Sequence, residues 1–106
     1  MKVIILILLS IYSLPAQNVQ GGSCSIIQMN QCMNFVTGIT TDEGFATCTG
    51  VKGKYSQTSC SRSEIVGVCS SFVAGKQIES IFYFPIWTVN KAKERCTMMK
   101  GNFQTN

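Results

Sequence analysis

The chain of 106 residues has no histidine, only two prolines and few charged side chains, which make up 13% of it. Without histidine, the Ser-His and Cys-His pairs that activate nucleophiles are excluded. The neighbouring carboxylates Asp42 and Glu43 stand at an expected helix start, where negative charge favours the helix dipole. The glycines lack the spacing of a phosphate-binding loop. We therefore expect no enzyme, no catalytic residue and no cofactor.

The chain also lacks any Cys-x-x-Cys pair, so neither a metal site nor a redox motif is expected. It does have six cysteines, and an even number in a short exported chain is typical of a disulfide framework. The six are Cys24, Cys32, Cys48, Cys60, Cys69 and Cys96.

The N-terminus has the pattern of a secretory signal peptide, which we place at residues 1–16. Lys2 supplies a positive charge, Val3–Leu9 is an uninterrupted apolar run, and Ala16 closes the apolar stretch. The run is shorter than the roughly 20 residues that span a bilayer, so a membrane anchor is the weaker alternative. A lipoprotein signal needs a cysteine directly after the run, and Cys24 lies too far along the chain.

Cleavage there leaves residues 17–106 as one small domain. We expect it to be secreted, either to the outside or to the periplasm and cell envelope, with no stable membrane span. Without Lys2, its eight basic and five acidic residues leave a charge of +3. A charge this small does not indicate nucleic acid as a partner.

Two segments of the domain resemble each other at an offset of 48 residues, which aligns Cys48 with Cys96 and Gly53 with Gly101. The other aligned pairs are Thr40 with Thr88, Thr49 with Thr97, Lys52 with Lys100, and Tyr55 with Phe103. We interpret them as an internal repeat of about residues 24–60 and 69–106.

Each repeat is expected to contain a hairpin, a helix and a return strand. In the first, Cys24–Ile39 has the pattern of a hairpin with Asn30-Gln31 as its candidate turn, and its apolar positions include Ile27 and Met29. Thr40 and Glu43 form a capping box for a helix to about Val51. The next glycine, Gly53, suits the left-handed residue after the helix.

In the second repeat, Ile65–Val73 and Ile78–Ile86 are predicted strands, and Thr88 begins a helix whose apolar stripe includes Ala92 and Cys96. Two such units, packed as one small disulfide-stabilised domain, give an α+β fold. The basic side chains of this helix could meet an anionic surface or polysaccharide, although a solvated face explains them more simply. They are Lys91, Lys93, Arg95 and Lys100.

The cysteine pairing remains open from sequence alone. The repeat favours a disulfide from each helix to the first strand of its own hairpin. This gives Cys69–Cys96, Cys24–Cys48 and, by what remains, Cys32–Cys60. The rival for the first unit has two local loops, Cys24–Cys32 and Cys48–Cys60.

The most distinctive apolar run is Ile81–Trp87, which has apolar residues on both faces of a strand. A central strand covered on both sides is one interpretation. The other is that one face, with Tyr83 and Trp87, is exposed and binds a partner, since these residues favour interfaces.

A series of motifs runs from Thr40 to the C-terminus. Its positions are Gly53, Tyr55, Cys60, Val66, Gly67, Cys69, Phe82, Tyr83, Phe84, Pro85, Trp87, Thr88, Ala92, Cys96, Gly101 and Phe103. In these the chain resembles a group of small exported, cysteine-rich bacterial repeat proteins, many of them classed as lipoproteins. The resemblance implies an exported, disulfide-linked domain of uncharacterised role. It carries over no active-site residue, and the chain departs from the group in lacking a lipoprotein cysteine.

Together these features predict a secreted, non-catalytic binding module for an unknown extracellular or envelope partner. The alternative is a small secreted effector, of toxin or protease-inhibitor type. In the inhibitor, the polar loop Ser61–Glu64 would be the reactive loop, with Arg62 as its primary side chain.

Overall fold

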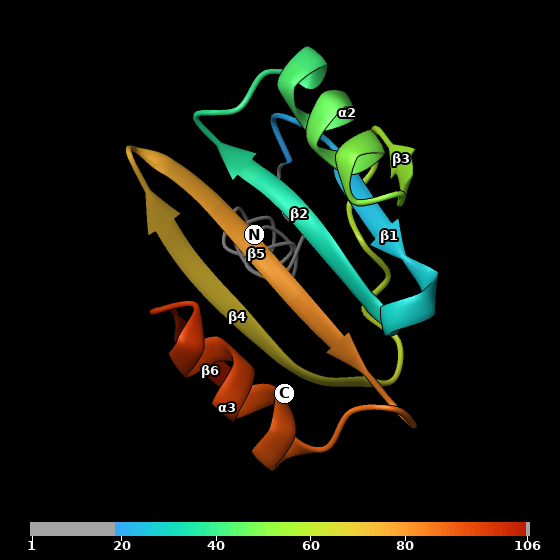
Figure 1. The fold of residues 1–106 in the computed structure, drawn as a ribbon, viewed down its shortest axis with the longest axis vertical. Helices are drawn as coiled ribbons and strands as arrows, with labels where there is room; N and C mark the ends of the chain where they lie inside the picture. The colour runs from blue at the N-terminus through green and yellow to red at the C-terminus, as the bar shows by residue number, and fades with distance from the viewer. Residues whose placement is uncertain (1–18, 106) are drawn as a thin grey trace, which may run out of the picture.

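The computed structural model describes residues 19–105, and its centre is an antiparallel sheet of six strands (Figure 1). Across the sheet the order is β3-β1-β2-β5-β4-β6. The strands are β1 (Ser23–Ile26), β2 (Gln31–Thr37), β3 (Lys54–Ser56), β4 (Ile65–Val73), β5 (Lys76–Tyr83) and β6 (Asn102–Thr105). The other elements are the helices α2 (Thr41–Gly50) and α3 (Val89–Met98) and the 3-10 turn η1 (Ile27–Met29). The fold is α+β, as the sequence predicts, while the predicted signal peptide lies outside the described residues.

Each half of the sheet is built on a hairpin. In the first half, residues 23–56, β1 and β2 are joined by η1 and by Asn30, whose φ is 53°. In the second half, residues 65–105, β4 and β5 are joined by Ala74 and Gly75, with φ values of 52° and 80°. Two successive left-handed residues make the tight turn whose twist matches that of a strand pair. The two halves meet where β2 pairs with β5.

Each helix begins at a threonine cap. The Thr40 hydroxyl accepts a hydrogen bond from the Glu43 amide at 3.1 Å, and the Glu43 carboxylate accepts one from the Thr40 amide at 2.9 Å. This is the predicted capping box, which is confirmed. The Thr88 hydroxyl accepts from the Lys91 amide at 3.2 Å, and a lysine at this position cannot return a bond as Glu43 does.

In both halves, the left-handed residue after the helix is a lysine and not a glycine. The left-handed residues are Lys52, with φ of 60°, and Lys100, with φ of 58°. The placement of Gly53 as the left-handed residue was therefore wrong. A Cβ on Gly53 would meet both sulfur atoms of the adjacent disulfide and a β1 carbonyl, and Gly101 has the same surroundings in the second half. Glycine is required at these positions by close approach to a disulfide.

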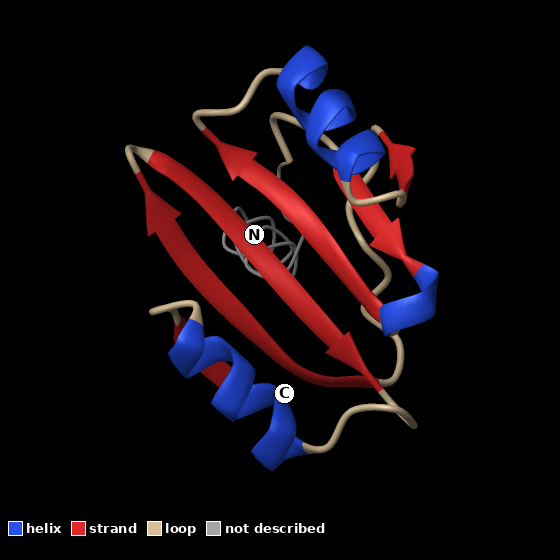
Figure 2. Cartoon of the chain, in the orientation of Figure 1, coloured by secondary structure: helices blue, strands red, loops and turns tan. Residues whose placement is uncertain are grey.

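Both helices lie on one face of the sheet, over opposite edges (Figure 2). The register shows this, since Cys24 lies opposite Met33, Met33 opposite Ser80, and Ser80 opposite Cys69. Directly opposed residues share a face of a sheet. The two cysteines at the ends of this row are bonded to α2 and α3 respectively.

The helices cover two apolar clusters on that face. The cluster under α2 contains Cys24, Ile26, Phe35, Ile39 and Cys48. The cluster under α3 contains Val66, Cys69, Phe82, Ala92 and Cys96. On the opposite face, the connection from β3 to β4, residues 57–64, carries Cys60, which packs with Cys32, Ile65 and Ile81. One face is thus covered by helices and the other partly by a connection without regular structure.

Candidate binding surface

All six cysteines are paired, so none offers a thiol for catalysis or metal binding. The disulfides are Cys24–Cys48, Cys32–Cys60 and Cys69–Cys96, the pairs favoured from the sequence. The first and third each join the first strand of a hairpin to the helix that follows it. The second joins β2 to the 57–64 connection and has no counterpart in the other half.

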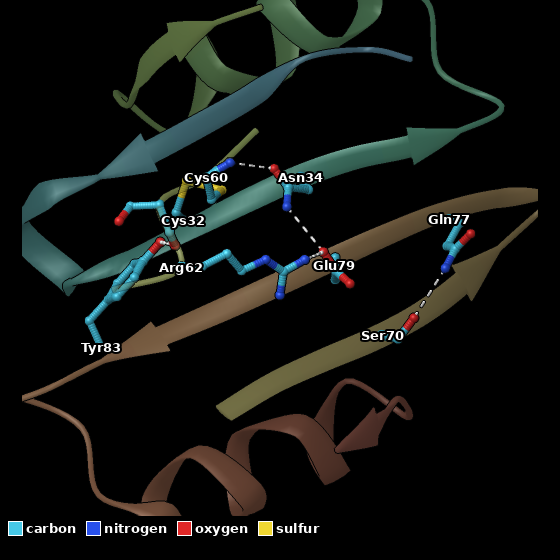
Figure 3. A network of polar contacts seen from close by, with 9 residues as sticks. Cys32, Asn34, Cys60, Arg62, Ser70, Gln77, Glu79 and Tyr83 are labelled. Carbon is cyan, nitrogen blue, oxygen red and sulfur yellow. Dashed lines mark hydrogen bonds and ion pairs between the residues drawn. A yellow bond between two sulfur atoms is a disulfide. The ribbon is translucent and has the colours of Figure 1, made fainter. Parts of the chain in front are cut away.

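A polar network holds this connection against the sheet (Figure 3). Asn34 on β2 is fully buried; its amide donates to the Glu79 carboxylate at 3.0 Å, and its carbonyl accepts from the Cys60 amide at 2.9 Å. Arg62 forms an ion pair with Glu79 at 3.1 Å. These polar groups satisfy one another, as buried polar groups must. We therefore assign the network a structural role.

The same geometry bears on the inhibitor alternative. A primary inhibitory side chain has to enter the pocket of a protease, but the Arg62 guanidinium is held by Glu79, whose side chain is only 14% exposed. Ser61, the neighbouring residue, accepts a hydrogen bond from Tyr83 at 2.8 Å. The 57–64 connection therefore lies bound to the sheet, and its geometry gives the inhibitor alternative no support.

Tyr83, the first candidate binding residue, ends β5 on the face of the 57–64 connection. It packs against the cluster of Cys32, Cys60 and Ile81. Burial raises the pKa of the Tyr83 hydroxyl, while the positive charge of Arg62 acts in the opposite direction. Its hydroxyl is already used as the donor to Ser61, so the side chain offers a partner chiefly its ring.

Trp87, the second candidate, lies on the other side of the sheet. Its ring meets Phe82 edge-on, with ring centroids 4.6 Å apart, and packs against the cluster under α3. The indole N–H donates to the Met29 carbonyl at 2.8 Å. Trp87 is partly buried and holds the start of α3 to the first hairpin.

The expectation that Tyr83 and Trp87 share a strand face is therefore wrong. The predicted strand to Ile86 is three residues too long, since β5 ends at Tyr83. Beyond it the chain turns back, and the Trp87 amide donates to the Tyr83 carbonyl at 3.2 Å. Alternation of side chains holds only within a strand, so it does not extend to Trp87.

What the structure does bring together is the pair of connections at this end of the sheet. Asn30, after η1, donates to the carbonyls of Tyr83 at 2.9 Å and of Phe84 at 3.1 Å, and its own carbonyl accepts from the Tyr83 amide. With the bond from Trp87 to Met29, these contacts fix the 27–30 segment to the 84–88 segment.

Four apolar side chains project from these two segments, and we call them the apolar end: Ile27, Met29, Phe84 and Ile86. They are 75%, 37%, 51% and 62% exposed, respectively. Ile27 and Met29 were expected among the apolar positions of an extended hairpin, which is wrong because η1 replaces the strand there. The turn expected at Asn30-Gln31 instead begins at Ile27, since η1 covers Ile27–Met29, Asn30 is left-handed and Gln31 already begins β2.

Two shallow hollows flank the apolar end. One of about 230 Å³ includes Ile27, Asn30, Ser61 and Tyr83 among its lining residues. The other, about 330 Å³, lies along α3 and is lined by Trp87, Lys91, Glu94, Arg95 and Met98. Each candidate residue from the sequence thus lines one hollow, on opposite sides of the same end.

Glu43 has its pKa lowered, first by the hydrogen bond from the Thr40 backbone and then by the charge of Lys76, so it acts in helix capping. Within residues 19–105, no three side chains of metal-ligand type come together as a metal site. In the same described part of the chain, no helix is long and apolar enough to cross a membrane.

A scan against protein-family models found no match, and neither did searches of curated proteins and of solved structures.

Proposed function

We propose that the chain is a secreted, non-catalytic binding module, and that it binds its partner through the apolar end. One observation carries this proposal: four apolar side chains are exposed on two segments that hydrogen bonds from Asn30 and Trp87 fix to each other. Exposed apolar side chains on a rigid support lose little conformational entropy when they bind. Three disulfides suit a small domain in an oxidising compartment, outside the cell or in its envelope.

The chain provides a matched control at the far end of the same hairpin. Phe72 and Val73 are 68% and 61% exposed and precede the β4–β5 turn, whereas Phe84 and Ile86 follow the other end of β5. Both pairs combine an aromatic ring with a β-branched side chain. They therefore match in chemistry and exposure but differ in position.

The experiment compares Phe84→Ser with Ile86→Ser against Phe72→Ser with Val73→Ser, each as a double variant. Native protein is tested for binding to arrays of glycans, lipids and envelope proteins. Binding should be lost in the first variant and kept in the second, while both retain wild-type unfolding midpoints. Equal binding by both double variants, or loss only in the Phe72 and Val73 variant, would contradict the proposal.

We further propose that the two halves are copies of one unit. Support comes from the shared order of hairpin, helix and edge strand, from the equivalent disulfides, and from the equivalent surroundings of Gly53 and Gly101. Matched variants in the two halves test this idea, since copies of one unit should respond alike in stability.

A further inference from the structure

The charges of the described chain are distributed unevenly. Between Thr88 and Gly101 there are four basic residues and one acidic residue, Glu94. Residues 19–87 and 102–105 together carry four basic and four acidic residues. The net positive charge of the described chain therefore resides on α3 and its C-terminal turn, where the basic side chains are exposed.

This charge lies directly beside exposed apolar groups. Lys91 and Arg95 line the same hollow as Trp87 and Met98, and Met98 is 75% exposed. Trp87 belongs to the 84–88 segment, which also carries Phe84 and Ile86 of the apolar end. Glu94 is the one acidic side chain lining it.

Basic and apolar side chains in this arrangement fit one kind of partner best. A soluble anionic polysaccharide would use the basic residues but would leave Phe84, Ile86 and Met98 in water. The interface of an anionic bilayer takes both, because lipid headgroups attract Lys and Arg while apolar side chains enter the acyl boundary. Tryptophan also prefers this interface.

We infer that the apolar end and the adjoining side of α3 dock on the surface of an anionic phospholipid bilayer. Phe84, Ile86 and Met98 enter the interface, and Lys91 and Arg95 contact the anionic headgroups. The docking is peripheral, since the inserted groups are side chains of a folded domain. This inference rests on the proposed function and names the class of partner for that surface.

The experiment measures binding of the native, disulfide-bonded protein to vesicles of phosphatidylcholine alone and of its equimolar mixture with phosphatidylglycerol. Only the mixed vesicles should bind, and binding should weaken as salt is added, because salt screens exposed charges. Lys91→Gln with Arg95→Gln should weaken it by about thirtyfold at low salt. Phe84→Ser with Ile86→Ser should weaken it by about tenfold or more.

The matched control is Lys76→Gln, which removes one positive charge and is compared with the single variant Lys91→Gln. It should keep binding within about twofold, because Lys76 begins β5 whereas Phe84 and Ile86 of the apolar end follow the last residue of that strand. An equal loss in this control would show attraction by net charge alone and would overturn the inference. Absence of binding to the mixed vesicles would also overturn it.

A parallel measurement of heparin binding distinguishes failure of the lipid inference from failure of the proposed function. Binding to heparin but not to vesicles, abolished by Phe84→Ser with Ile86→Ser, would overturn the lipid inference and leave the binding surface in place. Heparin binding that is unchanged in the Phe84→Ser with Ile86→Ser variant, without any vesicle binding, would contradict both the lipid inference and the proposed function.

Discussion

The two halves of the molecule share their internal framework and differ on their surfaces. In both, a disulfide joins the first hairpin strand to a helix, a lysine takes the left-handed position after the helix, and a glycine passes beside the disulfide. Yet the offset of 48 residues aligns Glu43 with Lys91 on the helix surface. The positions that agree are those that make contacts within a half. Glu43 and Lys91 are both exposed and opposite in charge, and of the two halves only the second carries a net positive charge.

The junction between the halves makes a second contrast. The Cys32–Cys60 disulfide and the contacts of Asn34 and Glu79 lie on the face opposite the helices and belong to neither framework. They connect β2 of the first half with the 57–64 connection and β5 of the second. Stability within each half and stability between halves therefore come from different residues, which variants can separate.

Removal of a framework disulfide should have the largest effect. Cys24→Ala with Cys48→Ala and Cys69→Ala with Cys96→Ala open loops of 24 and 27 residues. Each should lower the free energy of unfolding by about 3 kcal/mol, with almost no difference between them. Urea unfolding measures both values. If one double variant unfolds entirely while the other keeps the fold, the halves are not energetically equivalent.

Substitution of the two framework glycines should have the next largest effect. In Gly53→Ala and Gly101→Ala, the new methyl group meets disulfide sulfur atoms and a strand carbonyl. Overpacking of this kind costs about 1–3 kcal/mol, and the two variants should agree closely. Gly50→Ala is the control, because nothing lies within 4 Å of a Cβ built there. A loss in Gly50→Ala as large as in Gly53→Ala would remove the explanation by close approach.

Removal of the helix caps should lower stability by slightly different amounts in the two halves. Thr40→Ala and Thr88→Ala each remove a hydroxyl that accepts from a backbone amide, at a cost of about 1 kcal/mol. Thr40→Ala should cost somewhat more, because Glu43 bonds back to Thr40 while Lys91 cannot do so at Thr88. Unfolding midpoints in urea measure both losses of stability, and a larger loss in Thr88→Ala than in Thr40→Ala would contradict this prediction.

The smallest effect should depend on pH and appear only in the first half. The Thr40 amide and Lys76 hold the pKa of the Glu43 carboxyl below its ordinary value of 4.5. The folded pKa is lower than the unfolded one, so the stabilisation is complete above about pH 4.5 and is lost as pH falls through the folded value. The Tm gap between wild type and Glu43→Gln should therefore narrow on acidification.

Lys91→Gln at the aligned position serves as the control, because it removes no carboxylate. Its Tm difference from wild type should stay constant over the same acidic range. A gap for Glu43→Gln that widens as pH falls would contradict the role assigned to the capping box.

Local signals predicted much of the framework. The bounds of β4 agree with the predicted strand Ile65–Val73, because turn residues stand at both of its ends. The caps at Thr40 and Thr88 were predicted, since Thr40 forms a capping-box pattern with Glu43 and Thr88 precedes an amphipathic stretch. The alignment of Cys48 with Cys96 favoured the observed disulfide pairs, because it placed each cysteine on a helix beside its own hairpin, while the local pairs Cys24–Cys32 and Cys48–Cys60 stayed open as the rival.

The candidate surface was harder to predict, because it is formed where strands end. The prediction placed Ile27 in an extended segment and Trp87 on the same strand face as Tyr83, whereas β1 ends at Ile26 and β5 ends at Tyr83. Asn30 was not recognised as the residue that ties the two segments together, since its partners are more than 50 residues away. Contacts of that separation are set by the sheet register and leave no local pattern.

The Cys32–Cys60 disulfide also limits how freely the two halves can part. The connection spans residues 57–64, but Cys60 is bound covalently to the first half, so only residues 61–64 link that half to β4. So short a tether keeps β5 at a high effective concentration beside β2. Exchange of halves between two molecules requires this junction to open and the hairpins to separate. The disulfide therefore opposes domain swapping, in which β5 of one molecule would pair with β2 of another.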